Sequence, residues 1–147
     1  MLRPAHLHDI PKILYVIHES IRSCIADHQR NESQIQTWLE YKTQSQLTMW
    51  MLENDSWVYT IQEEIVGFMM CSDEGTILLN YVLPRVQEQG VGKDMLDFII
   101  EHAKTKNLPR LRVESTLTAV NFYRKSGFSI QSENAKNSNR IVLELEL

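Results

Sequence analysis

The chain has few cysteines, no long apolar run and no excess of positive charge. Its 147 residues contain two cysteines, Cys24 and Cys71, whose spacing matches no metal or redox motif, so we expect a reducing cytoplasm. No apolar run reaches about 18 residues, so no membrane span is expected. The first residues include Arg3 and Asp9 in place of an apolar core, which argues against a secretory signal.

Charge and composition narrow the classes of protein to which this chain could belong. A formal net charge of −4 argues mildly against a nucleic-acid surface and permits a cationic small substrate. His6 and His8 lie close in sequence without further ligand residues nearby, so no metal site is expected. A hydrophobic content of 43% and a charged content of 23% are ordinary for one soluble domain spanning residues 1–147.

Hydrophobic periodicity predicts an α+β domain with a mixed, mostly antiparallel central sheet flanked by helices. Asp9 is expected to cap the first helix, which has Pro11 in its first turn and fades near residue 27. The strand after the long helix is expected to run parallel to the strand before it, because a helix crosses between them. The predicted strands are 1–5, 57–61, 65–71, 76–83, 111–113, 128–131 and 140–147, and the predicted helices are 9–27, 31–39, 45–52, 91–103 and 118–126.

The segment from Gln87 to Gly92 joins a strand to a helix through two glycines. The helix carries an apolar stripe that begins at Val91 and recurs every four residues. Unpaired N–H groups and the helix dipole make such a junction a ready anion site, and glycines allow the backbone to approach the anion. A glycine-rich turn that merely begins a helix remains an equal alternative.

Two common nucleotide motifs do not fit this segment. The Rossmann fingerprint needs a third glycine, where this chain has Met95. The P-loop needs Gly-Lys-Ser/Thr, but Lys93 is followed by Asp94.

A second motif, Ala119-Val120-Asn121-Phe122-Tyr123-Arg124-Lys125-Ser126-Gly127-Phe128, follows one helix and one strand later. Together with Gln87-Glu88-Gln89-Gly90-Val91-Gly92, it resembles the GNAT superfamily of acetyl-CoA-dependent N-acetyltransferases. The first segment looks like the family's pyrophosphate loop, and the second like its A-x-x-F-Y-x-x-x-G-F motif. The opening Arg3-Pro4-Ala5 with Asp9 and the order of elements agree with the same family, so the resemblance implies a GNAT-like fold.

The resemblance implies a role for each matching position. The main chain around Val82 and Leu83 would pair with the pantetheine arm of acetyl-CoA, and Asn121 would lie near that arm. Lys93 and Arg85 could add positive charge, although a role as solvated surface residues is favoured for each. Glu88 stands where the family often has a basic residue, so its carboxylate would oppose phosphate binding unless it faces solvent. The backbone N–H groups that would cradle the pyrophosphate belong to Gln87, Glu88, Gln89, Gly90, Val91, Gly92 and Lys93.

Tyr123 is the predicted catalytic residue. A phenol with a reference pKa near 10 would first donate a hydrogen bond to the departing thiolate, since an ordinary thiol has a pKa of about 8.5. Phe122 and Phe128 are expected to pack in the core and leave Tyr123 free to meet the cofactor. A main-chain N–H near Val82 would polarise the thioester carbonyl.

The general base and the acceptor contacts are less defined. The strand before the loop has Asn80 where a carboxylate could serve as a base, so Asn80 is expected to contact substrate or hold a water. Arg22 would suit a carboxylate-bearing acceptor. Further bases are open among His18, Asp27, His28 and Glu114, and further acceptor contacts among Ser20, Cys24, Trp38 and Tyr41.

We therefore expect a cytoplasmic N-acetyltransferase that uses acetyl-CoA as co-substrate. It would acetylate the primary amine of a small molecule by direct transfer within a ternary complex of protein, acetyl-CoA and amine. A non-catalytic acyl-CoA-binding sensor and a protein lysine or N-terminal acetyltransferase are the alternatives. No nucleic-acid or membrane partner is expected, and the oligomeric state is open, a homodimer included.

Overall fold

A seven-stranded sheet in the order β1-β2-β3-β4-β5-β7-β6 forms the centre of the computed structural model, which describes residues 1–23, 33, 36, 43–133 and 140–147. All neighbouring strands in this sheet are antiparallel except β4 and β5, which are parallel. The predicted mixed, mostly antiparallel sheet is confirmed. The strands are β1 (Leu2–Pro4), β2 (Asp55–Ile61), β3 (Glu64–Cys71), β4 (Thr76–Val82), β5 (Arg110–Thr116), β6 (Ser129–Glu133) and β7 (Arg140–Glu146).

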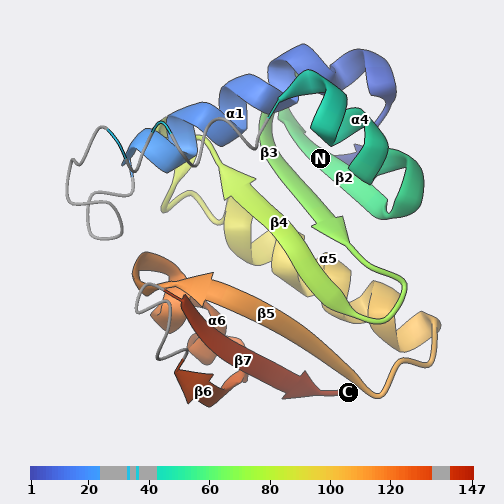
Figure 1. Cartoon of the computed structure of the whole chain (residues 1–147), viewed down its shortest axis with the longest axis vertical. Coiled ribbons are helices and arrows are strands. Elements are labelled where there is room, and N and C mark those ends of the chain that lie inside the picture. Colours follow the sequence, from blue (N-terminus) through green and yellow to red (C-terminus); the bar gives the residue numbers. More distant parts are fainter. Residues whose placement is uncertain (24–32, 34–35, 37–42, 134–139) are drawn as a thin grey trace.

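Helices cover both faces of this sheet (Figure 1). Helix α1 (Ile10–Ser23) packs on β3 and β4 with α4 (Gln44–Glu53) beside it, while α5 (Val91–Thr105) crosses the opposite face. The short helix α6 (Val120–Lys125) precedes β6. Single 3-10 turns at Leu7–Asp9, Pro84–Val86 and Leu117–Ala119 lead into α1, out of β4 and into α6. The helix predicted at 31–39 falls almost entirely outside the described residues.

The apolar stripes of the sequence form the core. In α5 the buried residues include Val91, Met95, Ile99 and Ala103, which is the predicted four-residue repeat. Strand β3 is buried along nearly its whole length because α1 lies on one face and α5 on the other.

A β-bulge in β4 opens the sheet. In the pairing with β3, Met70 lies opposite Leu79 and Cys71 opposite Ile77, so Leu78 is an extra residue in β4. Strand β5 pairs with β4 only at Thr76 and Ile77, just before the bulge. Bulges bend a strand and end regular pairing, so β4 and β5 diverge from Leu78 onward, as Figure 1 shows.

Asp9 is not the N-cap residue that the sequence predicts, because it is the third residue of a capping box whose N-cap is His6. Its carboxylate instead accepts two hydrogen bonds from Arg3, at 2.9 and 3.0 Å, and one from the backbone N–H of His6, at 2.9 Å. A bidentate bond to a guanidinium is stronger than a neutral cap, and β1 brings Arg3 within reach. Helix α1 therefore begins at Ile10, one residue after the 3-10 turn that Asp9 closes.

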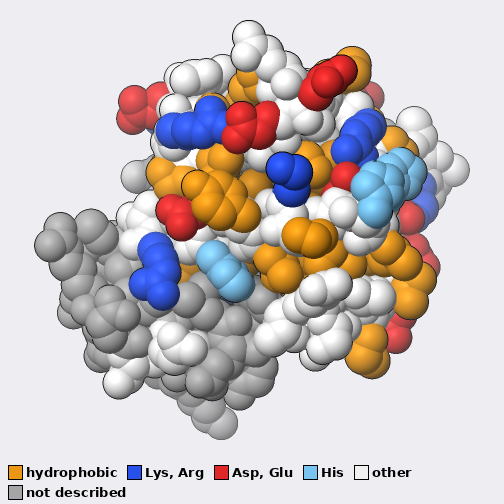
Figure 2. All heavy atoms as spheres, turned by 90° about the horizontal axis from the view of Figure 1, so that it is seen from above, with side chains coloured by type: hydrophobic (Ala, Val, Ile, Leu, Met, Phe, Trp, Pro, Cys, Tyr) orange, Lys and Arg blue, Asp and Glu red, His pale blue; other side chains and the backbone are white. Residues whose placement is uncertain are grey.

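The outer surface is mixed in character. In the view of Figure 2, charged side chains of both signs lie among apolar ones. Exposed apolar residues on the helical layer include Tyr15, Met49 and Leu52. None of the helices in the described segments is long and apolar enough to cross a membrane.

Candidate active site

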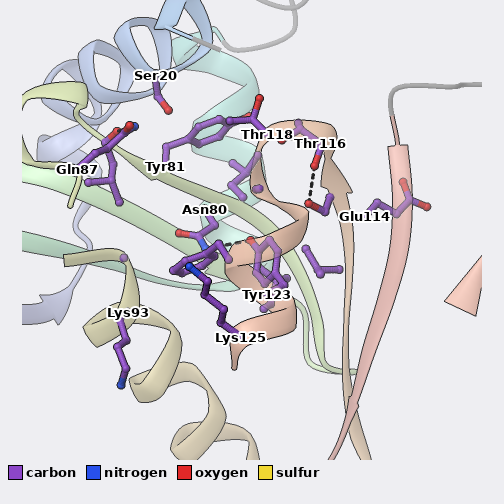
Figure 3. Close-up of a pocket in the computed structure, with 18 of the residues that line it drawn as sticks. Ser20, Asn80, Tyr81, Gln87, Lys93, Glu114, Thr116, Thr118, Tyr123 and Lys125 are labelled. Carbon is purple, nitrogen blue, oxygen red and sulfur yellow. Dashed lines mark hydrogen bonds between the residues drawn. The ribbon is translucent and has the colours of Figure 1, made fainter. Parts of the chain in front are cut away.

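The divergence of β4 from β5 creates a cavity of about 560 Å³. Its walls are β4 from Ile77 to Val82, β5 from Val113 to Thr116, the loop that begins α5, and α6. Figure 3 shows Ser20 of α1 at one side of this cavity, Tyr123 of α6 at its centre, and Lys93 of α5 at the other side.

Tyr123 is buried, with 4% of its surface exposed, yet it forms part of the cavity wall. Its ring makes edge contacts with Phe122 and Phe128, at centroid distances of 5.1 and 5.5 Å. Burial raises the pKa of its phenol to about 12, so the hydroxyl holds its proton at neutral pH. The sequence predicts that Phe122 and Phe128 both pack in the core. Phe128 is buried as predicted, but Phe122 also lines the cavity.

Asn80 of β4 is hydrogen-bonded to the Tyr123 hydroxyl. Its amide nitrogen donates a hydrogen bond of 3.0 Å to the phenolic oxygen, and this bond partly offsets the rise in the Tyr123 pKa. The amide oxygen Oδ1 of Asn80 is buried and has no hydrogen-bond partner among the residues that the structure describes. Because a buried acceptor without a partner is costly, Asn80 has a place for a further donor from the cavity.

The loop before α5 has the backbone of an anion site. Gly90 caps α5 in the left-handed region with φ of 84°, and a side chain there would meet nothing within 4 Å. The conformation alone therefore requires glycine, and the space beside it is open. The first N–H groups of α5 have no acceptor within the helix and carry the positive end of its dipole. The side chain of Gln87 ties the loop to β4 by donating to the carbonyl of Val82 at 3.2 Å.

Several charged side chains near this loop are already paired. Lys93 contacts Asp97 at 2.8 Å, and this hydrogen bond raises the pKa of the Lys93 ammonium. Arg85 donates to Glu64 and does not line the cavity. Glu88 is exposed and lines the cavity, with a positive φ of 72°. Because Glu88 is exposed, its carboxylate can turn to solvent.

The structure brings together most of the residues predicted for the site and separates others. Leu83 and Val91 are buried in the core, and the N–H of Leu83 donates to the Val66 carbonyl. Gln89, Asn121 and Arg22 are exposed, and these five residues do not line the cavity. The predicted residues that line it are Ser20, Asn80, Val82, Gln87, Glu88, Gly90, Gly92, Lys93 and Tyr123.

Of the residues suggested as general bases or further acceptor contacts, some line the cavity and others do not. Glu114 lines the cavity with its side chain 58% exposed, 3.8 Å from Arg112, whereas His18 does not line it. The remaining ones fall outside the described residues: Cys24, Asp27, His28, Trp38 and Tyr41.

Two cations in the cavity wall have no role in the sequence analysis. Lys125 lies within the second motif, at the end of α6. Arg140 comes from β7, which the fold places beside β5 by long-range pairing.

Comparisons with known proteins identify the family of this chain. The model of the acetyltransferase (GNAT) domain family matches residues 25–143. The chain belongs to the GNAT family. The predicted family and fold are thereby confirmed, and the protein is an acetyltransferase by family. Among curated proteins, none matches the sequence significantly.

Solved structures of GNAT proteins share the fold. A GCN5-related N-acetyltransferase from Rhodopseudomonas palustris is 21% identical with a TM-score of 0.90, covering 100% of this chain and 95% of that one. The PaiA N-acetyltransferase from Thermoplasma acidophilum, in complex with coenzyme A, is 18% identical with a TM-score of 0.90 and covers 100% and 98%. A GNAT acetyltransferase from Elizabethkingia anophelis with acetyl-CoA bound is 18% identical with a TM-score of 0.64 and covers 100% and 97%.

Proposed function

We propose that this GNAT protein transfers the acetyl group of acetyl-CoA to a primary amine of a small molecule in a direct ternary complex. The observation that carries the proposal is the position of Tyr123, a buried and protonated phenol in the wall of the cavity between β4 and β5. An anion-binding helix terminus lies at the same cavity. The two features suit the two ends of one thioester ligand that carries a pyrophosphate.

The residues of the cavity fit acetyl-CoA. Past Ile77 the edge of β4 is not paired with β5, so main-chain groups up to Val82 can bind an extended pantetheine arm as an added strand. The N–H groups around Gly90 and Gly92 can hold the pyrophosphate, because no side chain covers the space beside Gly90. Lys93 and Lys125 can contribute charge at this end. Asn121 is exposed on α6, and its predicted contact with the pantetheine remains a proposal.

The chemistry assigned to this chain centres on Tyr123. When bound, acetyl-CoA supplies the thioester carbonyl that the amine attacks. The Tyr123 pKa of about 12 lies roughly 3.5 units above that of a reference thiol, so full proton transfer would cost about 5 kcal/mol. Burial also raises the pKa of a thiol, so the difference between the Tyr123 pKa and the thiol pKa is smaller inside the cavity. Tyr123 therefore acts first as a hydrogen-bond donor to the developing charge.

The acceptor is proposed to enter from the side of α1. Ser20 is buried there and lines the cavity, and Tyr81 lies between Ser20 and Asn80 in Figure 3. Glu114 is the acidic residue of β5 at the cavity, and its side chain is 58% exposed, 3.8 Å from Arg112. A cytoplasmic location suits the buried free thiol of Cys71.

The experiment combines binding and turnover. Isothermal titration with acetyl-CoA should show binding to the parent protein and to Tyr123→Phe with similar affinity. Thiol release should be followed over polyamines, amino acids, aminoglycosides and peptides, and we expect Tyr123→Phe to lower the turnover at least 100-fold. The control is Tyr15→Phe, which changes an exposed tyrosine of α1.

Each outcome discriminates between functions. Binding without thiol release for any amine would identify an acyl-CoA sensor. Release with peptides alone would identify a protein acetyltransferase. Turnover of Tyr123→Phe at the parent rate would contradict the catalytic role proposed for Tyr123.

A further inference from the structure

The hydrogen bond between Asn80 and Tyr123 has a defined polarity. The amide nitrogen of Asn80 donates to the phenolic oxygen over 3.0 Å. Among the described residues, no other group is hydrogen-bonded to this hydroxyl. The phenol is therefore an acceptor toward Asn80, and none of the residues that the structure describes accepts its proton.

The opposite orientation of the Asn80 amide would have the opposite consequence. With oxygen and nitrogen exchanged, the amide oxygen would accept the phenolic proton, and Tyr123 would have no proton for the cavity. That orientation would also bury an amide nitrogen with two unpaired donors. In the observed orientation the buried amide atom that lacks a partner among the described residues is the acceptor Oδ1, and Figure 3 shows it pointing away from Tyr123.

Ser115 and Lys125, two other polar residues of the cavity wall, do not compete for this role. Ser115, which is buried in the cavity wall, donates its hydroxyl to the Thr116 carbonyl at 2.7 Å. Lys125 reaches the cavity from the same helix as Tyr123, but an ammonium can only donate. Any donor to the phenolic oxygen, like Asn80, leaves the phenolic proton free.

We propose that Asn80 is a positioning residue that holds the Tyr123 hydroxyl as a proton donor toward the cavity. This inference rests on the proposed acetyl transfer and deepens it, because it assigns the direction in which Tyr123 gives its hydrogen bond. The amide oxygen of Asn80 is left to receive an N–H of the acceptor amine or a water.

Asn80→Asp reverses the polarity of this bond with almost no change in shape. A carboxylate has no donor, so it would accept the phenolic proton of Tyr123 and withdraw it from the cavity. Asn80→Leu has a similar volume and removes the bond without capturing the proton. The two variants separate loss of orientation from reversal of orientation.

The first test needs no ligand. In the nitrogen-15 spectrum of the parent protein, the side-chain amide of Asn80 is assigned by its disappearance in Asn80→Leu. Tyr123→Phe keeps the ring and removes only the phenolic oxygen, so we expect it to move the bonded amide proton upfield, while Tyr15→Phe leaves it in place. An unmoved Asn80 amide in Tyr123→Phe would overturn the proposal.

The second test follows thiol release from acetyl-CoA with n-butylamine as the probe amine. We expect Asn80→Leu to lower the turnover about 10-fold and Asn80→Asp about 100-fold, with the Michaelis constant for acetyl-CoA within about twofold of the parent value. In a Tyr123→Phe background, Asn80→Leu should have no further effect, because both changes remove the same function.

The outcomes separate this inference from the function on which it rests. An equal loss from Asn80→Leu in both backgrounds would show a merely structural role and would overturn the proposal. Turnover of Asn80→Asp at the parent rate would also overturn it. If the parent protein releases no thiol with n-butylamine or any amine of the screen above, the proposed function fails together with this inference, whereas the spectrum without ligand still reports the hydrogen bond itself.

Discussion

Replacement of Asp9 should show how the start of the chain is held to the sheet. The carboxylate is 5% exposed and accepts three hydrogen bonds, two from Arg3 of β1 and one from His6. These bonds join the edge strand to the turn that leads into α1. The segment Arg3-Pro4-Ala5 with Asp9, by which the sequence resembles GNAT proteins, therefore has a structural reason.

The cost of the replacement can be estimated from the same contacts. Hydrogen bonds to charged groups contribute about 1.5–3 kcal/mol each, and breaking a fully buried pair costs about 3–5 kcal/mol. The Arg3 side chain is 34% exposed and can return to water, so the loss should be smaller. We expect Asp9→Asn to reduce the free energy of unfolding by about 2–3 kcal/mol at pH 7, equivalent to roughly 4–12 °C in the melting temperature.

The pH dependence provides an internal check. The hydrogen bond from Arg3, helped by that from His6, lowers the pKa of Asp9 in the folded protein. A lowered carboxyl pKa stabilises the fold above the unfolded value of about 3.9, and this stabilisation is lost as the pH falls through the folded value. The difference between parent and Asp9→Asn should therefore be constant from pH 5 to 8 and shrink below about pH 4.

Urea unfolding at several pH values measures both effects. The control is Asp97→Asn, which breaks the exposed pair with Lys93 and should cost below about 1 kcal/mol. The reasoning is refuted if Asp9→Asn unfolds within about 0.5 kcal/mol of the parent at pH 7, or if the difference is unchanged at pH 3.

Two further outcomes follow from the cavity and the core. Glu88→Arg should tighten acetyl-CoA binding about three- to tenfold at low salt and less at 0.5 M salt, because it replaces a carboxylate at the cavity with a positive charge. Isothermal titration measures this affinity, and Glu101→Arg, far along α5, serves as the control. An unchanged affinity for Glu88→Arg would contradict the expectation. Burial raises the pKa of the Cys71 thiol to about 11, so at pH 8 only about 1 thiol in 1,000 is ionised. Iodoacetamide should label Cys71 at least 100-fold more slowly in the folded protein than in urea, as read from the mass of its peptide, and equal rates would contradict its burial.

Local patterns were sufficient for much of the fold. The four-residue stripe from Val91 predicts α5, and turn residues between apolar runs predict β2, β3 and β4. These features depend on periodicity and turn chemistry within a few residues, which a sequence displays directly. The glycine loop was also visible in this way, because a positive φ at Gly90 requires that residue type.

Long-range pairing decided what the sequence could not show. Nothing local marks Leu78 as a bulge, because the extra residue is defined only by the register between β3 and β4. The insertion of β7 between β5 and β6 likewise brings Arg140 to the cavity without any local pattern. Competing registers differ in contacts between distant segments, so the tertiary structure selects among them.

The sequence by itself determined the family, the element order, the anion loop and Tyr123 as the residue to examine. The tertiary structure determined that Tyr123 is buried, that its hydroxyl accepts from Asn80 across 43 positions of sequence, and that Arg85 is engaged by Glu64. Protonation and hydrogen-bond direction depend on burial and on partners brought together by folding. They are therefore properties of the folded protein, which motif spacing does not contain.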